Sequence, residues 1–241
     1  MTPGLITYLL RKSRYKPTMF VDSSVALVLF DLDGTLVDSA ADLGHAANQM
    51  RMSRGLAELP LHLYRARAGS GARGMLAVAF SVTSDSPKYE ALRDEFLDVY
   101  ETYLLKTTRM FPEVPAVIDA LGRRAFRWGI VTNKAARFSR PLVAAMPALK
   151  SCTVLVSGDT TPFTKPHPAP LLEAARYAAV DPGRCVYVGD DERDVIAGRA
   201  AGMRTVAAAY GYLGVGSNLH DWGADGVIYS PMDLLQLLPS A

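Results

Sequence analysis

Short runs of apolar residues, each ending at polar or glycine residues, recur along the chain at 25–30, 128–131, 153–156, 185–188 and 205–208. Runs of this length predict strands that are buried on both faces, as in a parallel sheet. Stretches with helical spacing of apolar residues lie between them, at 114–127, 135–146, 168–179 and 191–201. This alternation predicts a doubly wound α/β core.

The segment after the first predicted strand departs from this alternation. Residues 41–108 show helical periodicity and no convincing strand, with breaks that predict helices at 41–52, 60–67, 73–80 and 89–105. We therefore expect a small helical domain at 41–108, inserted into a core formed by 23–40 and 109–241. Within it, the stripe of Phe96, Tyr100 and Tyr103 predicts internal packing rather than a ligand platform.

Composition narrows the choice of partners. The 26 Lys and Arg residues against 24 Asp and Glu leave a net charge of +2, too small to indicate a nucleic acid or a membrane surface as partner. No apolar stretch reaches the roughly 20 residues that span a bilayer. In residues 1–22, which we expect to be a poorly ordered extension, basic residues follow the apolar ones, the reverse of a secretory signal. Cys152 and Cys185 are far apart and predict buried thiols in the cytoplasm.

Polar residues gather where the predicted strands end. These clusters are Asp31-Leu32-Asp33-Gly34-Thr35, Thr132-Asn133-Lys134, Ser157-Gly158-Asp159, and Gly189-Asp190-Asp191 followed by Asp194. In open α/β sheets, ligands bind at the carboxyl ends of the strands. We therefore expect the four clusters to converge on one edge of the sheet.

Each acidic cluster alone has an ordinary structural interpretation. The Asp31–Gly34 run is typical of a tight turn, and Asp190–Asp194 is typical of a helix N-cap with an acidic first turn. Carboxylates from two strand ends would repel one another unless a cation lay between them, and Mg²⁺ prefers such oxygen ligands. The candidate ligands are Asp31, Asp33 and Asp190, with a backbone carbonyl, and Asp194 as a ligand or as an acid that orients metal-bound water.

Lys165 lies in the proline-rich loop 165–170. A lone loop lysine is usually exposed, whereas one held by a following proline can place positive charge against Asp31 and a phosphate. Thr132 can add a hydroxyl and Asn133 a backbone N–H. Prearranged donors and cations of this kind provide most of the catalysis of phosphoryl transfer.

The order of these motifs resembles the haloacid dehalogenase (HAD) superfamily of phosphatases, over residues 24–238. Segment 31–39 resembles the first motif of the family, Thr132-Asn133 the second, Lys165-Pro166 the third and 189–194 the fourth. The resemblance implies a Rossmann-like core with a helical cap, Mg²⁺, and Asp31 as the nucleophile that forms an aspartyl-phosphate. It implies Asp33 as the acid and then the base, a residue that the dehalogenases of the family lack.

The resemblance also implies which residues bind the substrate, a small-molecule phosphate ester. Catalytic roles fall to Asp31, Asp33, Thr132 and Lys165, and phosphate binding to Gly34, Thr132, Asn133 and Lys165. The run Gly69–Arg73 resembles the cap loop that faces the catalytic site. Arg73 or Arg67 can pair with a substrate carboxylate or polar group, and a solvated arginine is the alternative for each.

Two substrates are implied by different parts of the chain. Thr132–Lys134, the loop 165–170 and Tyr210-Gly211-Tyr212 resemble phosphoglycolate phosphatases, which is the favoured interpretation. Segments 70–73, 90–100, 189–202 and 222–225 resemble N-acetylmuramic acid 6-phosphate phosphatases. A phosphomutase and a non-catalytic binding protein of the same fold are further alternatives, and both a monomer and a homodimer are compatible with the sequence.

Overall fold

The computed structural model describes residues 25–214, 216 and 218–239, so the extension expected at 1–22 lies outside the described residues. In this part of the chain, one six-stranded sheet has the order β5-β4-β1-β6-β7-β8, and every neighbouring pair is parallel. The strands are β1 (Leu27–Phe30), β4 (Arg127–Val131), β5 (Val154–Val156), β6 (Cys185–Gly189), β7 (Arg204–Ala208) and β8 (Gly226–Ile228). The predicted α/β fold is confirmed.

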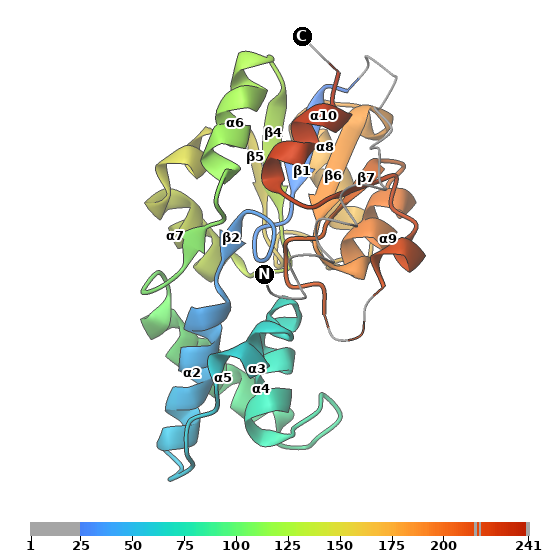
Figure 1. Cartoon of the computed structure of the whole chain (residues 1–241). Helices are drawn as coiled ribbons and strands as arrows, with labels where there is room; N and C mark the ends of the chain where they lie inside the picture. Colours follow the sequence, from blue (N-terminus) through green and yellow to red (C-terminus); the bar gives the residue numbers. More distant parts are fainter. Residues whose placement is uncertain (1–24, 215, 217, 240–241) are drawn as a thin grey trace.

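Helices cover both faces of the sheet because successive strand residues point to opposite sides. In β1, Val28 and Phe30 pack into one apolar cluster and Leu27 and Leu29 into another. The first cluster includes residues of α6 (Val114–Arg123), α7 (Ala136–Ala145) and α10 (Leu234–Leu237), and the second includes residues of α8 (Ala169–Tyr177) and α9 (Glu192–Ala200). Figure 1 shows this layered arrangement around the strands. Burial on both faces explains why the strands are continuous apolar runs.

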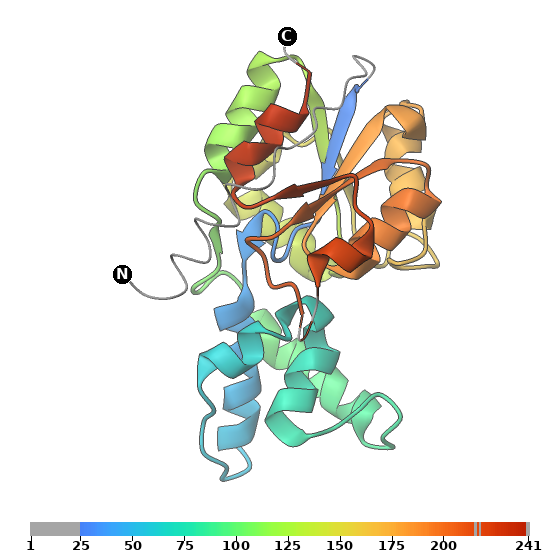
Figure 2. The same cartoon turned by 45° about the vertical axis from the view of Figure 1, so that its right-hand side comes forward.

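A group of helices lies beyond the carboxyl ends of the strands, and we call α2 to α5 the helical group (Figures 1 and 2). Its members are α2 (Ala40–Met52), α3 (Leu61–Arg65), the short 3-10 helix η1 (Ala68–Ser70), α4 (Gly71–Phe80) and α5 (Tyr89–Tyr103). The chain enters this group after β2 (Val37–Asp38) and leaves it through β3 (Arg109–Met110), and these two short strands pair antiparallel. Both crossings between the sheet and the helical group are therefore joined by backbone hydrogen bonds.

The buried carboxylate of Asp42 ties the same two crossings together from inside α2. Its oxygens accept hydrogen bonds from the backbone N–H groups of Thr107, at 2.8 Å, and Thr108, at 3.0 Å, and from the hydroxyls of both threonines. Asp42 is fully buried. One side chain thus fixes the start of the helical group against its end.

Replacing Asp42 by Ala should lower the free energy of unfolding by about 3 kcal/mol, because buried donors lose a charged acceptor. Asp94→Ala is the matched control, since Asp94 is exposed on α5 and surface changes stay within about 0.5 kcal/mol. Urea unfolding at constant pH measures both variants. Equal unfolding midpoints for the two variants would show that the Asp42 contacts do not stabilise the fold.

Candidate active site

The carboxyl ends of the central strands and the helical group line a cavity of about 610 Å³. The core lines it with Asp31, Asp33, Thr132, Asn133, Lys134, Ala135, Phe138, Thr164, Lys165, Pro166, Asp190, Asp191, Arg193 and Asp194. The helical group adds Leu43, Ala68, Gly69, Ser70, Gly71, Ala72, Arg73, Tyr89, Phe96, Leu97 and Tyr100. The structure therefore brings the predicted clusters of the first, second and fourth motifs, and Lys165, to one site.

Three carboxylates meet at the base of this cavity. Oxygens of Asp31, Asp190 and Asp194 lie within 4.8 Å of one another, and Asp190 and Asp194 are each 2% exposed. Burial raises the pKa of Asp31 to about 6, while Lys165 acts to lower it and Asp194 to raise it. Burial, together with the charges of Asp31 and Asp194, also raises the pKa of Asp190 well above its usual range. A divalent cation fits this set of oxygens because it would relieve the repulsion among them.

Lys165 supplies a buried positive charge beside the carboxylates. Its Nζ lies 2.9 Å from Asp31 Oδ1 and 2.7 Å from Asp194 Oδ1, and the side chain is 3% exposed. Burial acts to lower the pKa of Lys165, but the carboxylates of Asp194 and Asp31 outweigh it and raise the pKa above its ordinary value. The ammonium therefore stays charged and holds Asp31 in a fixed position.

Asn133 holds the lysine loop through its side chain. Its Nδ2 donates to the carbonyl of Lys165 and its Oδ1 accepts from the N–H of Lys165, both at 2.9 Å. The neighbouring Thr132 is buried, and its hydroxyl oxygen accepts from the N–H of Lys134 at 3.1 Å. Asn133 of the second motif thus positions Lys165 of the third. The roles of Thr132 and Asn133 in binding phosphate stay predictions.

Asp33 faces a different set of partners from Asp31. Lys134 Nζ donates to both of its carboxylate oxygens at 3.1 Å, and the Ser39 hydroxyl donates to Oδ1. The carboxylate of Asp33 lies outside the acidic cluster named above. Its predicted role as a metal ligand and its predicted role as acid and base both stay predictions.

The first motif packs directly on Asp190. Gly34 has a φ of +89°, and a Cβ atom at this position would lie 2.1 Å from Asp190 Oδ2, so only glycine fits. The Thr35 hydroxyl donates to Asp190 Oδ1 at 3.0 Å, and the N–H of Tyr212 donates to Oδ2 at 2.8 Å. Gly34 therefore permits the close approach that places Asp190 beside Asp31.

Tyr187, in β6, is a site residue that the sequence analysis missed. Its hydroxyl accepts from Lys165 Nζ at 2.8 Å and lies 2.9 Å from the Val131 carbonyl and 3.1 Å from Asp194 Oδ1. A tyrosine within a buried aliphatic strand is a usable signal, because its hydroxyl needs a polar partner. The Tyr187 hydroxyl therefore contacts both members of the Lys165–Asp194 ion pair and helps to hold them in position.

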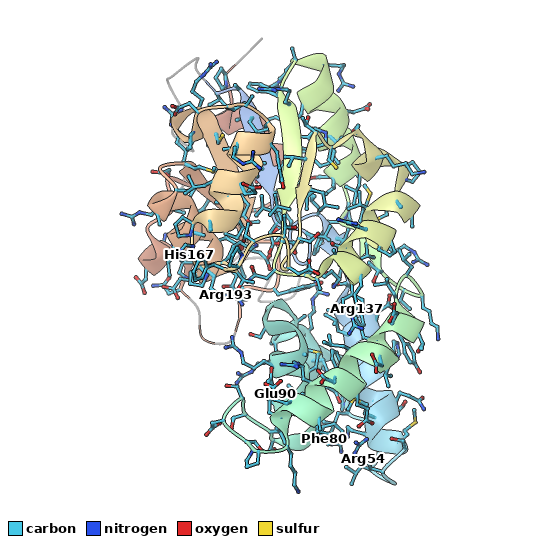
Figure 3. The ribbon with its side chains drawn as sticks, turned by 180° about the vertical axis from the view of Figure 1, so that it is seen from behind. Arg54, Phe80, Glu90, Arg137, His167 and Arg193 are labelled. Carbon is cyan, nitrogen blue, oxygen red and sulfur yellow. The ribbon has the colours of Figure 1, made fainter. Side chains whose placement is uncertain are left out.

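The two candidate arginines of the helical group differ in position. Arg73 lines the cavity, whereas Arg67 is exposed and is not among the described lining residues. A third arginine, Arg193 of α9, is labelled in Figure 3. It pairs with Asp191 and donates to the Gly69 carbonyl at 2.6 Å. Arg193 therefore connects the fourth motif to the helical group, a contact that sequence spacing alone does not predict.

Comparison with known proteins places this geometry in a family. Residues 28–208 match the family model of the haloacid dehalogenase-like hydrolases. The chain belongs to this family. It is 39% identical over 214 residues to the N-acetylmuramic acid 6-phosphate phosphatase of Pseudomonas aeruginosa, covering 89% of this chain and 95% of the relative. It is 44% identical over 207 residues to a phosphoglycolate phosphatase of Xanthomonas campestris, covering 86% and 93%.

The solved structures agree with the fold. A predicted phosphoglycolate phosphatase from Haemophilus somnus superposes with a TM-score of 0.77 at 26% identity, covering 88% of this chain and 97% of that chain. The relatives are named phosphatases, and the predicted class, a phosphoric monoester hydrolase of this family, is confirmed.

The raised pKa of Asp31 predicts how the stability of the metal-free protein depends on pH. Asp31 has an ordinary pKa of 3.8 and a folded pKa of about 6, so the folded state binds more protons between these values. Ionisation of Asp31 therefore costs stability as the pH rises from about 4 to above 6, by about 3 kcal/mol at about 1.4 kcal/mol per pKa unit.

Denaturation in EDTA from pH 4 to pH 7 should show Asp31→Asn gaining stability over wild type as the pH rises through this window. Asp119→Asn, on the exposed face of α6, should show no such trend. A difference between Asp31→Asn and wild type that does not change with pH would contradict the burial cost assigned to the Asp31 carboxylate.

Tyr187→Phe should lower kcat about tenfold with little change in KM, because Lys165 loses an acceptor and Asp194 loses a nearby donor. Tyr177→Phe is the control, since Tyr177 is 53% exposed on α8. Steady-state hydrolysis of one phosphate ester by the two variants gives the comparison. An unchanged kcat for Tyr187→Phe would mean that the hydroxyl does not position Lys165.

Proposed function

We propose that this protein is a Mg²⁺-dependent phosphatase that hydrolyses a small-metabolite phosphate monoester through an aspartyl-phosphate on Asp31. The observation that carries the proposal is the contact of Lys165 Nζ with Asp31, at 2.9 Å, beside the buried carboxylates of Asp190 and Asp194. This arrangement supports a fixed nucleophile next to positive charge and a cation site.

The proposed reaction has two steps. A carboxylate oxygen of Asp31 attacks phosphorus, and the bond from phosphorus to the ester oxygen breaks as Asp33 gives a proton to that oxygen. Water then attacks phosphorus while Asp33 takes its proton, which releases inorganic phosphate and restores the Asp31 carboxylate. Lys165 orients Asp31 and offsets negative charge on the phosphoryl group.

Mg²⁺ is the proposed cofactor, held by Asp31 and Asp190 with Asp194 beside them. When bound, it supplies positive charge that neutralises the phosphate and orients its oxygens. Asp194 also holds Lys165 at 2.7 Å, which supports a role in orienting the lysine as well. The contributions of Asp33 to metal binding and to proton transfer are retained as predictions, and the contact with Lys134 orients the Asp33 carboxylate.

We propose residues 41–108 as a cap domain over this site. The helical group lines the cavity from the side opposite the strands, and Arg193 contacts the Gly69 carbonyl across the interface. A cap of this kind excludes water and selects the substrate. We also propose a cytoplasmic location, supported by two cysteines that are free in the structure. No helix in the described part of the chain is long and apolar enough to cross a membrane.

Phosphoglycolate is the first candidate substrate, supported by the relative at 44% identity whose name specifies it. N-acetylmuramic acid 6-phosphate is the second, supported by the relative at 39% identity and by the size of the cavity. A volume of about 610 Å³ falls within the range of about 300–1,000 Å³ that is typical of small-molecule sites, and it leaves room for an amino sugar. The aromatic wall formed by Phe96, Tyr100 and Phe138 suits the ring of an amino sugar better than a two-carbon acid.

Asp31→Asn should lower phosphate release by at least about a thousandfold, because the amide is not a nucleophile. Phosphate release with MgCl₂ should be measured on 2-phosphoglycolate, N-acetylmuramic acid 6-phosphate, hexose phosphates and p-nitrophenyl phosphate. Asp119→Asn is the control for the loss of a surface carboxylate.

The same panel separates the two substrates. A preference for 2-phosphoglycolate supports the first candidate, and a preference for N-acetylmuramic acid 6-phosphate supports the second. Activity that survives Asp31→Asn would overturn the aspartyl-phosphate assignment. A wild-type protein that hydrolyses none of these esters would overturn both substrate assignments.

A further inference from the structure

Tyr100, in α5, lines the active-site cavity, and no described residue accepts a hydrogen bond from its buried hydroxyl. The residue is 1% exposed. The Lys134 ammonium lies close enough to influence the pKa of the phenol, but an ammonium can only donate, so the phenol proton has no acceptor among the described residues. Buried hydroxyls are normally satisfied, and leaving one unsatisfied costs stability. An unsatisfied hydroxyl on the wall of a ligand cavity therefore indicates a function.

The surroundings of Tyr100 hold its ring in place. The ring packs against Phe96, with centroids 6.1 Å apart, and against Phe138, with centroids 5.2 Å apart. Lys134 Nζ lies 4.8 Å from the ring centroid, and the same nitrogen is 3.1 Å from both oxygens of Asp33. The aromatic contacts hold the ring, and the Lys134 ammonium, which is paired with Asp33, lies over its face.

The residues of the aromatic stripe in α5 differ in their surroundings. Phe96 and Tyr100 are buried, as a packing stripe predicts, yet both also line the cavity. Tyr103, one turn further on, is half-buried and donates to Gln49 at 3.3 Å. The hydroxyls of Tyr100 and Tyr103 thus differ in whether the protein itself satisfies them.

We propose that the Tyr100 hydroxyl donates a hydrogen bond to an oxygen on the organic part of the substrate, close to the ester oxygen. The ligand class is a phosphate ester with a carboxylate, carbonyl or hydroxyl oxygen near the ester carbon. The inference rests on the proposed phosphatase function and makes Tyr100 a specificity-determining residue of that site.

Two features favour a donor to an oxygen acceptor. Burial raises the pKa of Tyr100, so the phenol keeps its proton and can donate it. The ammonium of Lys134 adds positive charge at the same place, which favours an electronegative group on the ligand. A site built to hydrogen-bond a substrate oxygen also discriminates against an analogue that lacks it, because its own polar group is then left unpaired.

The test compares Tyr100→Phe with wild type on an ester that carries such an oxygen and on ethyl phosphate, which does not. For whichever of 2-phosphoglycolate and N-acetylmuramic acid 6-phosphate the wild type prefers, kcat/KM should fall about tenfold or more. For ethyl phosphate it should change by less than about twofold. Tyr103→Phe is the matched control and should leave both esters unchanged.

Thermal denaturation separates this role from a structural one. Because Tyr100→Phe removes a hydroxyl that has no partner, its Tm should equal or exceed that of wild type. A lower Tm with equal losses on both esters would overturn the proposal, since it would indicate general packing. An unchanged kcat/KM on the preferred ester would overturn it as well.

Measuring ligand binding in a variant that cannot turn over tests the role of Tyr100 separately from the proposed phosphatase function. In the Asp31→Asn background, calorimetry should give a Kd for 2-phosphoglycolate or N-acetylmuramic acid 6-phosphate that is weakened about tenfold by Tyr100→Phe. If the wild type hydrolyses no ester, the phosphatase proposal fails while this comparison still decides the role of Tyr100. Equal Kd values, or no binding of either ester, would overturn the Tyr100 proposal.

Discussion

The burial of three carboxylates around one ammonium is the constraint on which the rest of this site depends. Asp31, Asp190 and Asp194 share one edge of the sheet with Lys165, and their charges do not balance. Taking such charges out of water is costly unless opposite charge and hydrogen bonds compensate. A dication is the ligand that would offset this excess of negative charge.

Neighbouring residues keep this unfavourable cluster in place. Gly34 lets the loop after β1 lie against Asp190. The backbone N–H of Tyr212 donates to the same carboxylate. Asn133 and Tyr187 hold Lys165 at its backbone and its ammonium. The sheet brings the strand ends together, but these side-chain contacts set the distances on which the chemistry depends.

The helical group completes the site from the other side. Asp42 and the β2–β3 pair join the two points where the chain crosses between the sheet and the helices. Arg193 contacts the Gly69 carbonyl, and Tyr100 reaches the Lys134–Asp33 pair. The core supplies the charged groups, and the helical group supplies most of the apolar wall and an unpaired hydroxyl. Because the charged groups and the apolar wall come from different parts of the chain, substrate preference can change through the helical group while the charged groups of the core stay the same.

The sequence predicted the elements well because buried parallel strands and amphipathic helices have distinct apolar patterns. The rule that strand ends converge was enough to bring Asp31, Thr132 and Asp190 together. The strand β8 was not predicted, because Gly226-Val227-Ile228 is too short for a recognisable pattern. The helix predicted at 114–127 ends at Arg123, since Ala125 adopts a left-handed φ of 59° and Arg127 begins β4.

Side-chain partners far apart in sequence could not be predicted in the same way. Nothing in the local pattern indicates that Lys134 pairs with Asp33 or that Asp42 accepts from Thr107 and Thr108. The periodicity of α5 correctly predicts that Tyr100 is buried, but it contains no information about where the hydroxyl ends. Such details depend on the packing of several elements at once.

The most direct test of the central claim is to isolate the phosphoenzyme. An ester with a radiolabelled phosphoryl group is mixed with the protein and MgCl₂ and quenched in acid, and the labelled peptide is then mapped. The account predicts an alkali-labile acyl phosphate on Asp31, absent from Asp31→Asn. Label on any other residue, or turnover without a labelled protein under conditions that trap acyl phosphates, would contradict it.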